Sequence, residues 1–158
     1  MQAQATGPAS DTGHLLEGAD FSDTYGIAVE EPDLDAIAAA RHMMARTPRW
    51  VAGLLVVRNL AVAPFGLRGA PPERTSTPER MGFFPVISQT PERVVLGFDD
   101  RHLDFRVVVD VMGDGATRRV MATTLVRTHN LFGRGYLKAV LPFHRMIVPA
   151  MLRRVARP

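Results

Sequence analysis

The length, composition and charge of the chain set the first limits on its fold and function. Its 158 residues are 46% hydrophobic and 22% charged, which is ordinary for one folded domain that buries roughly 70% of its unfolded surface. The absence of cysteine excludes disulfides, thiolate nucleophiles and cysteine-ligated metal sites. The opening residues do not form a signal-peptide pattern, and no apolar run reaches the about 18 residues that a membrane helix needs. We therefore expect a cytoplasmic protein without a membrane span.

The formal net charge is +3, and almost all of the positive charge is carried by arginine, because Lys138 is the only lysine. A coding bias toward arginine explains this most simply. The alternative is an anion-binding surface, since guanidinium groups match carboxylate and phosphate. The arginines are scattered from Arg41 to Arg157 rather than clustered beside aromatic residues, so nucleic acid is not an expected partner.

The first half of the chain predicts a tail, a strand and two helices. Residues 1–19 are small and polar, which is typical of a flexible tail that precedes a domain over 20–158. The alternation in 21–30 predicts a first strand, and Pro32 with Asp33 opens a helix. A second helix is expected from Thr47–Pro48 to between Pro64 and Gly69, followed by a long surface loop over 69–80.

The second half predicts an antiparallel meander. Alternating runs over 83–89, 93–100, 102–112 and 118–128 read as four strands, and Gly113-Asp114-Gly115 is a hairpin signal between the last two. Short connections favour antiparallel pairing of neighbours. In 102–112, apolar side chains occupy one face and His102, Asp104 and Arg106 the other.

A long amphipathic helix completes the predicted fold. Asn130 is a suitable N-cap for a helix over 131 to about 155. Pro142 and Pro149 each remove a helical hydrogen bond, so the helix is expected to bend. A bent helix leaves more room over a curved sheet than a straight one, and we therefore expect a cavity between helix and sheet.

Three segments resemble an uncharacterised bacterial family, DUF2867: GFDDRHLDFRV (97–107), TLVRTHN (124–130) and GRGYLKAVLPFHRMIVPAML (133–152). The segments 50–67 and 21–30 are similar to its earlier helix and opening strand. The family is grouped with the START-like, Bet v 1-like helix-grip superfamily. The resemblance implies an α+β fold in which a curved antiparallel sheet wraps around a long C-terminal helix. It implies no single activity, because that superfamily contains lipid and hormone binders, cyclases, oxygenase domains and chaperone activators.

The polar residues of the third predicted strand are the first candidates for chemistry. His102, Asp104 and Arg106 share a face at i, i+2 and i+4. A carboxylate beside a histidine raises the imidazole pKa and fixes its tautomer, as a general base requires, and Arg106 would hold an anionic oxygen. The alternative, which the alternation favours, is a solvated outer face on which Asp104 pairs with Arg106. His129, at the junction of strand and helix, joins His102 and Asp104 as a catalytic candidate. The alternative for His129, which we favour, is a structural hydrogen bond.

Further candidates lie along the final helix. Tyr136 lies on the apolar stripe and is the best polar anchor for a ligand. His144 lies between two prolines, where it either bonds a freed carbonyl or points into the cavity. The predicted ligand-binding residues are Tyr136, His129, His102, Arg106, Phe143, Val140 and His144.

The motifs that are absent limit the chemistry further. The five histidines lack metal-ligand spacing, and there is no phosphate loop, dinucleotide fingerprint or hydrolase elbow, so neither a metal nor a cofactor is expected. Our leading hypothesis is a protein that binds a small hydrophobic or amphiphilic molecule between sheet and helix. The alternatives are a cofactor-independent, cyclase- or isomerase-like enzyme with a histidine acid/base, and an interaction module or homodimer.

Overall fold

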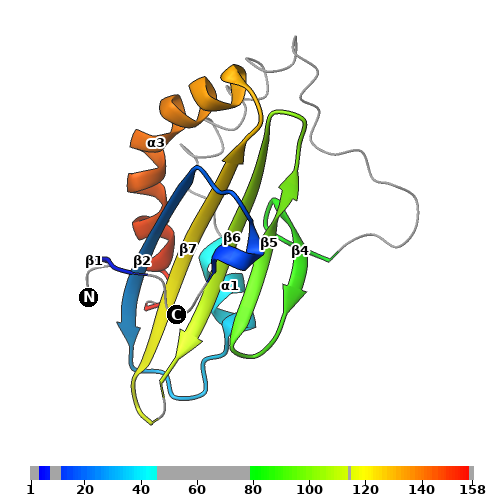
Figure 1. Ribbon diagram of the computed structural model, residues 1–158. Helices are drawn as coiled ribbons and strands as arrows, with labels where there is room; N and C mark the ends of the chain where they lie inside the picture. Colours follow the sequence, from blue (N-terminus) through cyan, green and yellow to red (C-terminus); the bar gives the residue numbers. More distant parts are fainter. Residues whose placement is uncertain (1–3, 8–11, 46–78, 114, 157–158) are drawn as a thin grey trace.

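A computed structural model describes residues 4–7, 12–45, 79–113 and 115–156. The second predicted helix and almost all of the predicted loop over 69–80 lie outside these ranges. Within them, the chain forms an α+β fold with one open antiparallel sheet of seven strands (Figure 1). The strand order across the sheet is β1-β2-β7-β6-β5-β4-β3.

The elements of the described part are four short or edge strands, three long central strands, and three helical segments. The strands are β1 Gln4–Ala5, β2 Phe21–Val29, β3 Arg80–Met81, β4 Phe84–Gln89, β5 Arg93–Asp99, β6 Leu103–Met112 and β7 Arg118–Thr128. The helical segments are the 3-10 turn η1 Gly13–Leu15 and the α-helices α1 Ala36–Met44 and α3 Leu131–Leu152.

The predicted meander is confirmed. Strands β4 to β7 pair in sequence order, each antiparallel to the next, and β2 closes against the free edge of β7. The turn between β6 and β7 has Gly113 at φ +105° and Gly115 at φ +92°. Because side chains with a Cβ rarely adopt these angles, glycine suits both positions.

The main core lies between the sheet and its two helices. The side that carries Leu96, Val109 and Ala122, here called the inner face, packs against both α1 and α3. α1 contacts β5 and β6, while α3 lies along β2 and β7 (Figure 1). The alternation along the strands produces this division, because every second side chain points to the same side of a sheet. The expected cavity between helix and sheet would lie on this inner face, which core side chains of both helices largely fill.

The first helix begins later than its sequence suggests. Asp33 lies in a turn, and the cap is Asp35, whose carboxylate accepts the backbone N–H of Ala38 at 2.6 Å. The prediction that Pro32 and Asp33 open the helix is therefore wrong by about one turn. Either aspartate satisfies the sequence rule for a cap, and the packing of Ala36 in the core selects the later one.

Part of the segment expected to be a flexible tail packs on the sheet. On the outer face, opposite the helices, Leu16 is buried against Val95, Val108 and Leu125. The Asp20 carboxylate accepts the hydroxyl and the backbone N–H of Thr128, both at 2.6 Å, and these bonds lower the pKa of Asp20. Residues 12–19 thus differ from the expectation of a flexible tail. The outer face of the sheet carries apolar as well as polar side chains, and the few apolar side chains of this segment cover them.

The long final helix follows its prediction closely. Asn130 is its N-cap, it ends at Leu152, and it is bent rather than straight (Figure 1). Pro142 and Pro149 lie inside it, and each removes a backbone donor that would hold the preceding turn. In the described part of the chain, no helix combines the length and apolar character needed to cross a membrane.

Candidate functional site

The N-terminus of α3 is seated on the turn between β5 and β6. The Asn130 side-chain oxygen caps the helix by accepting the Gly133 N–H at 2.9 Å, so its amide nitrogen is left to donate. That nitrogen lies 2.9 Å from Nδ1 of His102 and 3.4 Å from the Arg101 carbonyl. The His102 carbonyl in turn accepts the N–H of His129 at 2.9 Å. One asparagine therefore fixes both the helix start and the His102 ring.

This arrangement determines which nitrogen of His102 carries the proton. Because the Asn130 amide donates to Nδ1, Nδ1 is the acceptor and the neutral ring is protonated on Nε2. Nε2 is buried, and among the described residues it has no hydrogen-bond partner. A buried donor without an acceptor costs about 1–3 kcal/mol. The ring is thus a donor that is held in place and still lacks an acceptor.

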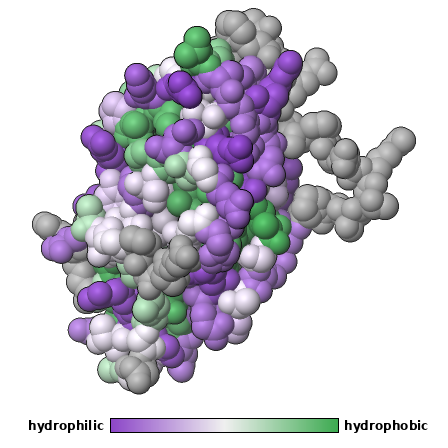
Figure 2. Space-filling view, viewed as in Figure 1, coloured by the Kyte–Doolittle hydropathy of each residue, from purple (hydrophilic) through white to green (hydrophobic). Residues whose placement is uncertain are grey.

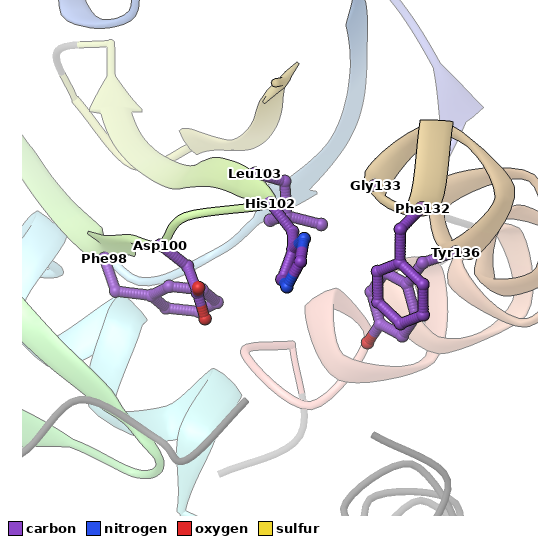
Figure 3. A pocket seen from close by; sticks show the side chains of 7 residues that line it. All are labelled: Phe98, Asp100, His102, Leu103, Phe132, Gly133 and Tyr136. Carbon is purple, nitrogen blue, oxygen red and sulfur yellow. The ribbon is translucent and has the colours of Figure 1, made fainter. Parts of the chain in front are cut away.

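A small pocket surrounds this donor. Its volume is about 10 Å³, which is room for one water molecule at most. It lies where the β5–β6 turn meets the first turns of α3, and the side chains around the His102 ring come from both elements (Figure 3). The lining residues are Phe98, Asp100, His102, Leu103, Phe132, Gly133 and Tyr136.

The ring of His102 lies between two groups of side chains. Phe132 packs against it with ring centres 4.8 Å apart. In Figure 3, the Phe132 and Tyr136 rings stand on the helix side of His102, and Asp100 and Phe98 stand on the strand side. The ring nitrogen farther from the backbone points into the space between these groups. The pocket therefore combines aromatic walls with one oriented donor.

A row of aromatic side chains continues from this pocket across the inner face. Phe105 lies between Phe98 and Phe84, with ring centres 5.7 Å and 5.4 Å away. All three are only partly buried, and they lie on β4, β5 and β6, whereas α3 contacts β2 and β7. Aromatic rings supply a large apolar contact area, so the row extends the apolar wall of the pocket.

A second polar cluster lies farther along α3, also on its sheet-facing side. His144 Nε2 contacts both carboxylate oxygens of Asp23 on β2, at 3.0 and 3.1 Å, and Phe21 packs edge-on against the ring at 5.9 Å. Tyr25 is two residues along the same strand face. Burial, followed by the nearby Asp23 carboxylate, raises the pKa of Tyr25, so its phenol remains a neutral donor. The cluster joins a carboxylate, an imidazole and a phenol.

The structure separates the residues predicted for the site. His102 and Tyr136 come together at the pocket. Arg106 and His129 do not reach it, because they belong to the outer face with Asp104: His129 Nε2 lies 3.0 Å from Asp104, and Arg106 lies 2.7 Å from Asp99. The Arg106 guanidinium also donates to the backbone carbonyls of Phe98 and Phe105.

The strand prediction for His102 is wrong by one residue. β6 begins at Leu103, and His102 lies in the preceding bend, so it does not share a face with Asp104 and Arg106. The sequence marks this bend only by Asp100 and Arg101. The expected pairing of Asp104 with Arg106 is also replaced, since Asp104 pairs with His129 and Arg106 with Asp99.

The remaining predicted residues lie on α3 beyond the pocket. Val140 is partly buried, and Phe143 is 44% exposed. His144 contacts Asp23, and neither expected alternative, a freed carbonyl or an open cavity, describes its position. Sequence reasoning missed Asp23, Asp100 and the aromatic row. The alternation in 21–29 places Asp23, Tyr25 and Ile27 on one face and was a usable signal for the first of them.

The histidine and carboxylate side chains of the described residues do not form a metal site. No group of three or more histidine, aspartate or glutamate side chains lies there in positions that could hold a metal ion. The three catalytic candidates from the sequence do not form one cluster either, because His102 lies in the bend whereas Asp104 and His129 pair on the outer face.

The Asn130 amide allows a prediction about the His102 tautomer. Asn130→Asp keeps an oxygen for the Gly133 N–H but replaces the donor to Nδ1 with a second acceptor. We expect the His102 ring proton to move from Nε2 to Nδ1 while α3 stays capped. Nitrogen-15 chemical shifts of the histidine ring report the tautomer, and an unchanged Nε2-protonated ring in this variant would contradict the assignment.

Comparisons with known proteins give a family but not an activity. No curated protein matches the chain. A crystal structure of CalU16 from Micromonospora echinospora is similar at 12% identity over 85% of this chain and 80% of that one, with a TM-score of 0.32, too low to support an argument. The model of a family described as "Protein of unknown function (DUF2867)" matches residues 15–151. The chain therefore belongs to the DUF2867 family.

Proposed function

We propose that this protein is a helix-grip protein of the START-like superfamily that binds a small, mainly apolar molecule carrying one hydrogen-bond acceptor. The ligand sits where the β5–β6 turn meets the start of α3. The observation that supports this most directly is the buried Nε2 of His102, which lacks an acceptor among the described residues and faces a pocket with aromatic walls.

The chemistry of the ligand follows from the groups around the pocket. A neutral imidazole protonated on Nε2 donates one hydrogen bond, so it selects a carbonyl, ether or hydroxyl oxygen or a ring nitrogen. Phe98, Phe132 and Tyr136 provide apolar contact area, which supplies most of the affinity in sites of this kind. Asp100 places a carboxylate on the strand side, which disfavours an anionic ligand.

Binding of a ligand larger than one water molecule requires side chains at the pocket to move. A volume of about 10 Å³ admits one water molecule, so a larger ligand enters only when side chains at the pocket rotate away. Phe132 and Tyr136 belong to the first turns of α3, and rotation about χ1 moves an aromatic ring without moving the helix. The apolar row from Phe98 to Phe84 then adjoins the enlarged pocket.

A second candidate is an enzyme that uses a histidine as acid and base without a cofactor. The observation that favours it is the cluster of Asp23, His144 and Tyr25 on the sheet-facing side of α3. A carboxylate that holds an imidazole beside a neutral phenol is an arrangement suited to proton transfer. Under this alternative, His144→Gln abolishes turnover of a bound ligand and leaves its affinity unchanged.

Matched fragments test the binding proposal. Acetophenone and ethylbenzene have similar shapes, but only acetophenone has a carbonyl acceptor. We expect acetophenone to bind roughly 5–10-fold more tightly, the ratio that one hydrogen bond of about 1 kcal/mol produces. NMR titration of the full chain measures both affinities, and resonances of Phe98 and Tyr136 locate the binding.

His102→Phe keeps a ring but removes the donor, so the preference for acetophenone should vanish. His14→Phe is the matched control, because His14 is exposed on η1 at the outer face, and it should keep the preference. A melting curve shows whether each variant is folded. Equal affinity for the two fragments in the unaltered chain, or a preference that survives in His102→Phe, would contradict the proposal.

A further inference from the structure

The side of α3 that faces away from the sheet carries large apolar side chains that are exposed to solvent. Leu131 is 82% exposed, Met146 63% and Phe143 44%. Ala139, Phe143 and Met146 recur at i, i+4 and i+7, so they form one stripe along the helix. Figure 2 shows hydrophobic groups among hydrophilic ones over the part of the surface where α3 lies. The bent helix thus has a second apolar face besides the one in the core.

A stripe of positive charge runs beside this apolar stripe. Arg134, Lys138 and Arg145 are all exposed and recur at i, i+4 and i+11. The 22 residues of α3 contain no aspartate or glutamate, so no acidic side chain of the helix itself neutralises them. Asp20, just before β2, interacts electrostatically with Arg134 at the start of the stripe. Lys138 and Arg145 immediately precede Ala139 and Met146 in the chain, which places the two stripes side by side.

Charge and shape together select one kind of partner. A second copy of the chain, docked symmetrically through this face, would bring two basic stripes together, which is unfavourable. The exposed apolar side chains form a ridge on the convex helix surface that extends about 22 Å from Leu131 to Met146, with Leu131 about a quarter turn away from the apolar stripe. A ridge without a concave seat is poorly matched to a rigid protein surface, whereas lipid headgroups and chains adapt to it.

We propose that the outward side of α3, which faces away from the sheet, docks onto an anionic membrane surface. Phe143, Met146 and Leu131 enter the boundary between headgroups and acyl chains, and the basic stripe contacts anionic headgroups. The chain lies on the surface and does not cross it. This inference rests on the outward side of α3 and is independent of the His102 pocket, which uses the opposite side.

Vesicle flotation with the full chain tests the proposal. We expect the protein to float with vesicles of phosphatidylcholine containing 30% phosphatidylserine and to remain unbound with phosphatidylcholine alone. Lys138→Gln/Arg145→Gln should weaken binding roughly 30-fold, the change that about 1 kcal/mol per basic residue corresponds to. Phe143→Ser/Met146→Ser should weaken it at least about 10-fold, since it removes apolar groups from the interface.

Matched controls carry the same kinds of substitution at positions outside α3. Arg80→Gln/Arg119→Gln removes two exposed cations, and Ile87→Ser/Met112→Ser removes two exposed apolar side chains, all on strands. Each should change binding less than about 3-fold. Absence of binding to anionic vesicles at low salt overturns the proposal, as do equal losses in the controls. Binding to poly-L-glutamate without binding to vesicles would indicate an acidic protein partner and would also overturn it.

Discussion

Gly133→Ala is expected to destabilise the protein by about 1–3 kcal/mol, which is the usual cost of forcing atoms into a packed interior. A Cβ at this position would overlap the backbone carbonyl oxygen of His102, which cannot rotate away as a side chain can. The same carbonyl accepts the His129 N–H, so the β5–β6 turn and the start of α3 would have to separate. Chemical denaturation of the two proteins measures the difference in unfolding free energy.

Gly135→Ala provides the control within the same helix. Nothing lies within 4 Å of a Cβ at Gly135, and the residue is exposed. Because alanine is favoured over glycine in a helix by about 1 kcal/mol, this variant should be slightly more stable than the original chain. If the two substitutions had the same effect, the close seating of α3 on the His102 turn would be wrong.

His144→Ala is expected to destabilise the fold by about 2 kcal/mol. The side chains of His144 and Asp23 are only 13% and 19% exposed, so removal of the imidazole leaves a largely buried carboxylate without its partner. Loss of one member of a fully buried pair costs about 3–5 kcal/mol, and partial exposure reduces that figure. The contact joins α3 to β2, so the effect should appear in global unfolding.

A double-mutant cycle isolates this contact. Asp23→Asn/His144→Ala should be no less stable than His144→Ala, because the unpaired charge has been removed. His14→Ala, at an exposed histidine outside the cluster, should change stability by less than about 0.5 kcal/mol. Additive effects of Asp23→Asn and His144→Ala would show that the pair does not couple α3 to the sheet.

The position of α3 on the sheet affects both the His102 pocket and the outward side of the helix. Its N-cap Asn130 contacts the His102 ring, His144 in its middle contacts Asp23 on β2, and its outward side carries exposed apolar side chains. A change in how the helix packs on the sheet would therefore affect both the pocket and the outward side of α3. We therefore expect Gly133→Ala to weaken ligand binding at the proposed pocket as well as the stability of the fold.

Most strands and the final helix were predictable from sequence because their signals are local. Alternation set the bounds of β2, β5 and β7 to within one residue, and Asn130 marked the start of α3. The start of α1 was displaced because two aspartates satisfy the capping rule and only packing distinguishes them. Residues 12–19 were misjudged because three apolar side chains in a polar segment are enough to cover a small patch.

The candidate site was less predictable, since its contacts join distant parts of the chain. Asp23 and His144 are 121 residues apart, and Asn130 and His102 are 28 apart. The alternation rule also treated His102 as part of a strand. A bend of two residues removed it from the polar face of Asp104 and Arg106 and turned it toward α3.

The ring nitrogens of His102 provide the most direct test of the proposed site. In protein labelled with nitrogen-15 on histidine, the neutral His102 ring should carry its proton on Nε2, and saturation with acetophenone should shift that Nε2–H signal downfield. A ring protonated on Nδ1, or an Nε2–H signal that saturating acetophenone leaves unmoved, would contradict the account.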